Sequence, residues 1–201
     1  MTTQELTIPT DQDKEEARAQ FDYHTKVLGL KHTFTFDEVW DGLLKQRLAK
    51  QKKESFREGV TNFEEKLKSM PGSLGADPFP LVHTFSDGLY IRQLTCPAKT
   101  LTVTKIHKQE HAFFLLKGTI SVLTEDGVKK FTAPYQGITK VGTKRIIYHH
   151  DEVIFTTVHS TDKKTVEEVE EQVIAKDFGE INSIEEQVNI KEFIDIIKLE
   201  E

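Results

Sequence analysis

Residues 102–127, "TVTKIHKQEHAFFLLKGTISVLTEDG", place two histidines four apart, then an apolar run, then an Asp-Gly pair. Asp126-Gly127 between two apolar runs is typical of a tight β-hairpin. The surrounding chain repeats this pattern, with short runs such as "GLYIRQLT", "RIIYHH" and "VIFTTVHS" separated by turn signals. Closely spaced strands with no helix between them predict a mainly β protein, an antiparallel barrel or sandwich.

The segments on either side of these strands are polar and have helical spacing. Residues 1–33 lack a clear period and are expected to begin as a disordered tail. Thr35 with Glu38, and Thr61 with Glu64, are capping-box pairs, so residues 34–70 are predicted to form two helices separated at Gly59. Helices are also expected after Thr165 and over "SIEEQVNIKEFIDIIKLEE". The predicted division is 1–75 for tail and helical arm, 76–162 for the barrel and 163–201 for C-terminal helices.

Composition narrows the classes of protein that the chain can represent. The 201 residues carry a formal net charge of −6, which argues against general nucleic-acid binding. No apolar run reaches the roughly 20 residues of a membrane span, and no signal peptide is evident. The single cysteine, Cys96, cannot form an internal disulfide, which fits a reducing compartment. A cytoplasmic location is expected, and the basic stretch "KQRLAKQKKESFR" is interpreted as the solvated face of a helix.

The histidines are the strongest functional signal. Side chains alternate across a strand, so residues of equal parity share a face. If Leu101, Val103, Phe113 and Leu115 point inward, Lys105, His107 and His111 point inward with them. Buried ionisable groups are costly unless they are paired, bound to metal or open to water. Three interpretations stay open: a metal site, a metal-free ligand pocket, or two histidines satisfied by hydrogen bonds.

At this point the stretch resembles the cupin superfamily of small double-stranded β-barrels. Six residues separate His111 from Gly118, which puts His111 in the position of the family's glutamate ligand, and His107 takes that of its second histidine. The segment "KVGTKR" is similar to the second motif, with Gly142 retained. The resemblance covers roughly residues 80–160, and the chain looks like the cupin-like proteins encoded by phages and prophages. It implies a jelly-roll barrel with an N-terminal helical arm and C-terminal helices.

The sequence departs from the family's ligand pattern at two positions. Lys105 replaces the first histidine and Arg145 the histidine of the second motif, and both cations repel a metal ion. A metal would therefore need a third ligand. His159 is favoured because it shares a face with Phe155 and Thr157; the other candidates are His83, Glu110 and His149. The expected cofactor is a divalent ion among zinc, iron, manganese and nickel, or no metal at all.

Lys105 and Arg145 also suggest an electropositive pocket that would suit a carboxylate or phosphate. Tyr90 and Arg92 are candidate pocket residues on the strand "GLYIRQL". The competing interpretation is that each cation pairs with a nearby acid, such as Glu110 or Glu125, and that Tyr90 and Arg92 only pack.

Three functions are compatible with these residues. The first is a binding protein that holds a metal or small anionic ligand in the barrel. The second is a structural or assembly protein, for instance in a virion, that uses the barrel as a scaffold. The third is a metal-dependent enzyme of unknown substrate, which is disfavoured because no general base stands out. A homodimer is expected, since the apolar face of the helical arm needs a partner.

Overall fold

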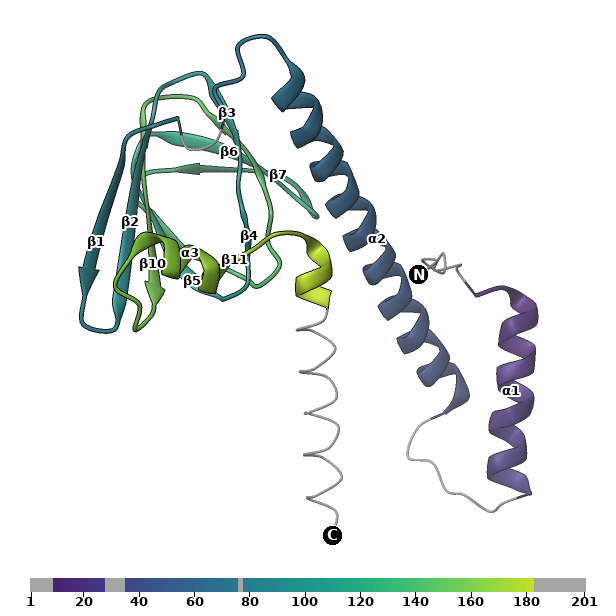
Figure 1. Ribbon diagram of the computed structural model, residues 1–201. Coiled ribbons are helices and arrows are strands. Elements are labelled where there is room, and N and C mark those ends of the chain that lie inside the picture. Colours follow the sequence, from purple (N-terminus) through teal and green to yellow (C-terminus); the bar gives the residue numbers. More distant parts are fainter. Residues whose placement is uncertain (1–8, 28–34, 76–77, 183–201) are drawn as a thin grey trace. The chain divides into compact units, whose positions relative to one another are not determined.

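The computed structural model describes residues 9–27, 35–75 and 78–182, drawn as ribbons in Figure 1. The chain divides into two compact units, Met1–Glu58 and Gly59–Glu201. The first unit holds a helix and most of a second one, and the second unit holds the strands. The functional residues predicted from the sequence all lie in the second unit.

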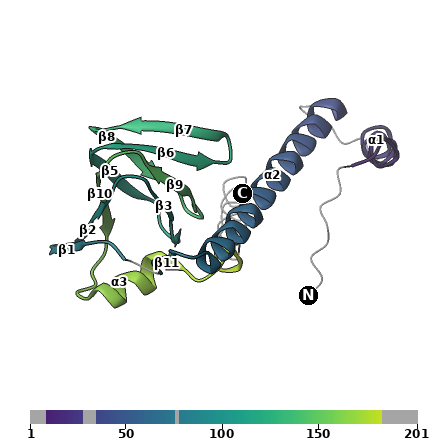
Figure 2. The same cartoon turned by 90° about the horizontal axis from the view of Figure 1, so that it is seen from above.

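The strands form two antiparallel sheets that face each other across a shared interior (Figures 1 and 2). The five-stranded sheet has the order β1-β2-β10-β5-β8, the four-stranded sheet has the order β3-β9-β6-β7, and β4 pairs with β11. Their bounds are β1 Leu81–Ser86, β2 Leu89–Cys96, β3 Thr100–Val103, β4 Ile106–His107, β5 His111–Lys117, β6 Thr119–Thr124, β7 Gly127–Thr132, β8 Tyr135–Thr139, β9 Ile146–His149, β10 Val153–Ser160 and β11 Ile174–Ala175. The predicted mainly β architecture of antiparallel strands is confirmed.

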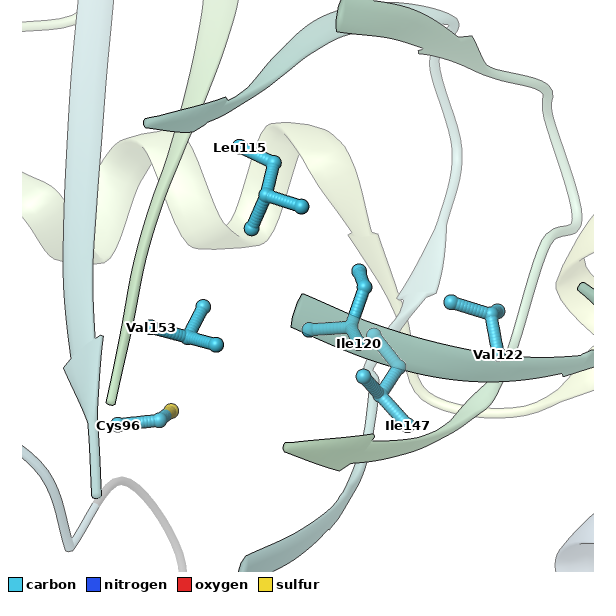
Figure 3. Close-up of a cluster of buried hydrophobic side chains, with 6 residues drawn as sticks. All are labelled: Cys96, Leu115, Ile120, Val122, Ile147 and Val153. Atoms are coloured by element: carbon cyan, nitrogen blue, oxygen red, sulfur yellow. The ribbon is translucent and has the colours of Figure 1, made fainter. Parts of the chain in front are cut away.

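Apolar side chains from both sheets close one end of the barrel. The six buried members of this core converge on one another in Figure 3: Cys96, Leu115, Ile120, Val122, Ile147 and Val153. Those on β2, β5 and β10 come from one sheet and those on β6 and β9 from the other. Burial of such side chains from water is the main favourable term that holds the two sheets together.

Two glycines fix the path of the chain between strands. Gly127 has φ +102° at the end of the predicted hairpin, where Thr124 pairs with Gly127. Gly118 has φ +84° where the chain crosses from β5 in one sheet to β6 in the other. A Cβ built at Gly118 would lie 2.5 Å from the backbone oxygen of Glu152. No other residue fits this crossing without displacing β10.

The N-terminal segment corrects one expectation from the sequence. Residues 11–26, predicted to belong to a disordered tail, form helix α1 (Asp11–Lys26), which begins at a Thr10–Asp13 capping box. Within the first unit, Arg18 donates to Asp37 at 2.6 Å, and the Phe21 ring lies 5.7 Å from that of Phe36. These contacts supply the stabilisation that the weakly periodic sequence did not reveal.

Helix α2 (Phe36–Ser69) is continuous, so the predicted break at Gly59 is wrong. Its beginning is confirmed, because the Glu38 backbone N–H donates to the Thr35 hydroxyl and the Glu38 carboxylate accepts from the Thr35 backbone N–H. The second capping-box pattern, at Thr61, lies inside the helix. A single glycine costs a helix only about 1 kcal/mol, which a helix of 34 residues tolerates.

Helix α3 (Val166–Val173) follows the barrel and begins at the predicted Thr165–Glu168 capping box. Its Val169 and Val173 pack on Tyr90 of β2, so α3 covers the barrel beside that strand (Figure 2). The helix expected over "SIEEQVNIKEFIDIIKLEE" lies outside the described residues. No helix in the described ranges is long and apolar enough to cross a membrane.

Candidate metal centre

Three histidines from three strands meet inside the barrel, and they are called the histidine triad below. His107 comes from β4, His111 from β5 and His159 from β10. The pairing of β10 with β5 runs through Thr157 opposite Phe113 and Val158 opposite Ala112, which brings His159 beside His111. The ring centroid of His111 lies 4.2 Å from that of His159 and 4.3 Å from that of His107.

The backbone around His107 is held from two directions. His107 pairs with Ile174 of β11, and the neighbouring Lys108 N–H donates to the Val173 carbonyl at 2.8 Å. On the other side, the Gly142 N–H donates to the His107 carbonyl at 2.8 Å. The α3–β11 segment therefore positions this histidine as well as covering the barrel.

Only some of the nitrogen atoms of the triad have hydrogen-bond partners. Nδ1 of His111 lies 3.3 Å from the Gln109 carbonyl oxygen, and Nε2 of His159 lies 3.2 Å from the Thr157 hydroxyl. Nδ1 of His107 and Nδ1 of His159 are buried with no hydrogen-bond partner in the described chain. Unsatisfied buried polar atoms are rare because each costs about 1–3 kcal/mol. Two of them in one cluster indicate a site shaped for something that the protein alone does not supply.

Burial keeps the three imidazoles neutral. It lowers the pKa of His107 to about 2, with smaller effects from the charges of the other two histidines, Arg92 and Arg145. It lowers the pKa of His159 to about 4, and that of His111 also falls. Neutral imidazole is the form that binds metal, so no proton needs to be removed near neutral pH.

The spacing of the triad fits a metal ion. One ligand nitrogen from each histidine lies within 4.8 Å of the others. An ion at the centre of such a triangle lies within about 2.8 Å of each nitrogen, so shifts of under about 1 Å would give the usual zinc–nitrogen distances of about 2.0–2.1 Å. Three protein ligands with an open fourth position are the arrangement of catalytic zinc sites.

The expected shared face of residues 101–115 is only partly correct. His111, Phe113 and Leu115 point inward along β5, as predicted. Leu101 is exposed, however, and its neighbour Thr102 pairs with the buried Ile147. The chain leaves the strand between β3 and β4, so parity does not carry from Leu101 to His107.

The predicted ligand-binding residues occupy different environments. Lys105 forms a 2.8 Å ion pair with Glu170 of α3, so its charge is directed at that helix; the acid differs from those considered from the sequence. Arg145 and Arg92 lie close enough to His107 to lower its pKa. Tyr90 is buried under α3, and its hydroxyl lies 2.7 Å from Nδ1 of His83.

The other candidate metal ligands lie outside the triad. His149 is buried on β9, with its Nε2 3.0 Å from the Thr102 hydroxyl. Glu110 pairs with Lys140 at 2.6 Å, and His83 contacts Tyr90. Cys96 is in the apolar core, where burial raises the pKa of its thiol to about 11, far from a reactive thiolate.

An aromatic cavity next to the triad was not predicted. It has a volume of about 200 Å³ and is lined by side chains that include Phe113, Phe131, Tyr135, Arg145 and Phe155. Gly137 of β8 also lines the cavity and makes room for the Phe113 ring, because a Cβ at Gly137 would lie 2.7 Å from that ring. The inward parity of Phe113 with His111 was the available signal; strand β8, "YQGIT", was not recognised.

Comparison with known proteins gives similarities of fold only. No family model matches the sequence, and no curated protein does either. Among solved structures, an acetylacetone dioxygenase from Acinetobacter johnsonii is similar over 41% of this chain and 58% of its own, with 23% identity and a TM-score of 0.34. The chain thus spans less than two thirds of that enzyme's length.

Two further structures carry the word cupin in their names. A cupin-2 domain protein from Shewanella frigidimarina is similar over 49% of this chain and 92% of its own, with 9% identity and a TM-score of 0.35. The Cnp3 cupin domain of Schizosaccharomyces pombe is similar over 48% of this chain and 72% of its own, with 18% identity and a TM-score of 0.36. Similarity at this level says nothing of what this chain binds or does.

Proposed function

We propose that this protein binds one divalent metal ion in its barrel through His107, His111 and His159. The observation that carries the proposal is the pair of buried Nδ1 atoms, on His107 and His159, that have no hydrogen-bond partner in the described chain. Their proximity to His111 and the neutral state of all three rings support the same conclusion. Imidazole ligands suit zinc, iron, nickel and copper better than magnesium or calcium.

Metal content after loading and desalting tests the proposal. Wild-type protein is expected to retain about one zinc or nickel ion per chain, and His107→Ala, His111→Ala and His159→Ala are each expected to lose it. The matched control is His149→Ala, which removes another buried histidine with an unpartnered Nδ1 but lies outside the triad. Equal retention by all variants, or none by wild type, would refute the metal site.

A metal-dependent enzyme is the second candidate. A metal held by the three histidines alone would keep a free coordination position, where it would polarise a substrate or activate water. The cavity beside Phe113 and Arg145 offers space for such a substrate. The described cavity-lining residues include no carboxylate or histidine that would serve as general base. Binding is therefore the primary proposal and turnover the secondary one.

The remaining expectations from the sequence are part of the proposal. We also propose a phage or prophage origin, a cytoplasmic location and a homodimer, which are expectations from the sequence alone. The structural alternative, a barrel that serves as scaffold while the helical arm mediates assembly, draws on the exposed apolar side chains of Leu43 and Leu48 on α2.

A further inference from the structure

Four aromatic side chains line the cavity: Phe113, Phe131, Tyr135 and Phe155. Phe113 and Phe155 stack with ring centroids 5.2 Å apart, and Phe131 and Tyr135 lie 4.5 Å apart. Phe113 and Phe155 are on the five-stranded sheet and Phe131 is on the opposite one, so the walls come from both layers. Gly137 allows the Phe113 ring to pack against the backbone of β8, since a Cβ there would lie 2.7 Å from the ring. The cavity of about 200 Å³ that remains is large enough for a small organic molecule.

Arg145 gives this cavity a charge. Its backbone N–H donates to the Thr104 hydroxyl at 3.0 Å, which anchors the residue, and its guanidinium lies 5.9 Å from the Phe113 ring centroid. No carboxylate lies within ion-pair distance of that guanidinium in the parts of the chain that the structure describes. Burial lowers the pKa of Arg145, which reflects the cost of desolvating its charge. A planar guanidinium suits a carboxylate, which it binds through two parallel hydrogen bonds.

The charge balance of the triad also favours a bound anion. Three neutral imidazoles leave the full +2 charge of a bound metal uncompensated, and the charge of Arg145 reaches both His107 and His111. A nearby anion would offset both positive charges. The metal and the anion should therefore strengthen each other's binding, and thermodynamic linkage makes that effect reciprocal.

We infer that the cavity binds a small monocarboxylate with an aromatic or similarly flat apolar body, its carboxylate on Arg145 and its body among Phe113, Phe131 and Phe155. This inference rests on the proposed metal site for the coupling between the two ligands. Arg145 and the aromatic walls belong to the chain itself, so the carboxylate is expected to bind metal-free protein as well, though more weakly.

Calorimetric titration with three probes tests the inference. Benzoate combines charge and ring, benzamide has the ring without the charge, and acetate has the charge without the ring. Benzoate is expected to bind at least about tenfold more tightly than either, since a charge-assisted hydrogen bond and the burial of a ring each correspond to tenfold or more. Equal affinity for benzoate and benzamide, or no benzoate binding, would overturn the inference.

Variants distinguish a specific effect of Arg145 on benzoate affinity from a general effect of positive charge. Arg145→Gln should weaken benzoate at least about tenfold, and Arg145→Lys should weaken it less. Lys129→Gln removes another cation that lines the cavity and should change benzoate affinity less than about twofold. Circular dichroism and melting temperature establish that each variant is folded. A loss in Lys129→Gln as large as that in Arg145→Gln would contradict the assignment.

Cobalt(II) titration of the same samples distinguishes failure of this inference from failure of the metal site. Arg145→Gln should bind cobalt at least as tightly as wild type, because it removes a repelling charge. Benzoate should bind cobalt-loaded wild type more tightly than metal-free protein. Cobalt binding without benzoate binding overturns the carboxylate site alone. Benzoate binding that depends on Arg145, in protein that never binds cobalt, supports the carboxylate site and removes the metal centre.

Discussion

At the scale of single residues, burial decides what the histidines can do. His107, His149 and His159 are removed from water, and desolvation lowers the pKa of each. The difference between them lies in their neighbours: His107 and His159 have another imidazole close by, whereas His149 stands apart and bonds Thr102. His149 is thus the matched control for the triad, because it is also a buried histidine but has no neighbouring imidazole.

Acid should destabilise the metal-free protein through these residues. The pKa of His149 is about 4 when folded and about 6.5 when unfolded, so the unfolded chain binds the proton first as pH falls. Stability is unaffected by this residue well above pH 6.5 and is lost progressively between about pH 6.5 and 4, by roughly 3 kcal/mol. Urea unfolding at pH 7 and pH 4.5 measures this loss, which His149→Gln should reduce. An identical pH dependence in the variant would show that His149 is not buried in its neutral form.

Gly137 should be sensitive to a single added methyl group. Gly137→Ala would place a Cβ 2.7 Å from the Phe113 ring, and overpacking of this kind costs about 1–3 kcal/mol. Gly59→Ala is the control, because nothing lies within 4 Å of a Cβ there and alanine favours a helix by roughly 0.5–1 kcal/mol. Urea unfolding should thus show opposite signs for the two variants, and equal effects would contradict the tight contact at Phe113.

At the scale of elements, the helix and strand after the barrel position the site. Val169 and Val173 of α3 pack on Tyr90, and β11 then pairs with β4 at His107. The ion pairs of Lys105 with Glu170 and of Lys108 with Glu180 join the same segments. Loss of α3 would therefore expose one side of the triad as well as remove a helix.

The cap of α3 tests this dependence. Thr165→Ala removes the hydroxyl that accepts from the Glu168 N–H, and loss of such a cap costs about 1 kcal/mol. Lys164→Ala, at the exposed neighbouring residue, should cost less than about 0.5 kcal/mol. Urea unfolding measures both. A negligible effect of Thr165→Ala would mean that α3 does not fold cooperatively with the barrel.

The alternation of side chains between the two faces of one uninterrupted strand was predictable from the sequence. The relative orientation of residues in separate strands was not. The inward face of β5, with His111 and Phe113, followed from parity, as did His159 beside Thr157 on β10. Parity failed at Leu101 because the chain leaves the strand before Lys105. The pairing of His107 with Ile174, 67 residues apart in number, depends on tertiary structure that no local pattern records.

Helix features encoded in local motifs were likewise predictable from the sequence, and those that depend on tertiary contacts were not. The caps at Thr35 and Thr165 were predicted because the capping box is a local motif. Helix α1 was missed because its sequence is weakly periodic and its capping box has Asp13 in place of the usual glutamate or glutamine. Contacts with Asp37 and Phe36 on another helix add stabilisation that no local pattern records. Thr61 carries the capping pattern inside a continuous helix, where the preceding turns outweigh it.

At the scale of the whole molecule, the barrel interior combines an apolar core with a histidine cluster. Leu115 and Val153 belong to the core, and Phe113 lies between Leu115 and His111 along β5. Two of the buried unpartnered nitrogen atoms meet in the triad, where a metal would satisfy them, whereas that of His149 lies elsewhere. This arrangement is the basis for proposing a binding function over a purely structural one.

The oligomeric state tests the homodimer expected from the sequence. Leu43 and Leu48 on α2 are exposed in a single chain, which favours association. Light scattering coupled to size exclusion should give a mass of about 46 kDa, twice the 23.1 kDa of one chain, and Leu43→Lys with Leu48→Lys should lower it if α2 forms the interface. A wild-type mass of one chain would contradict the dimer.

The most direct test of the metal centre is an anomalous-scattering map from crystals grown with zinc, recorded above and below the zinc edge. We predict one strong peak per chain inside the barrel, about 2.0–2.1 Å from one nitrogen of each of His107, His111 and His159. A map with no peak among these imidazoles, while zinc is bound elsewhere or nowhere, would contradict the account.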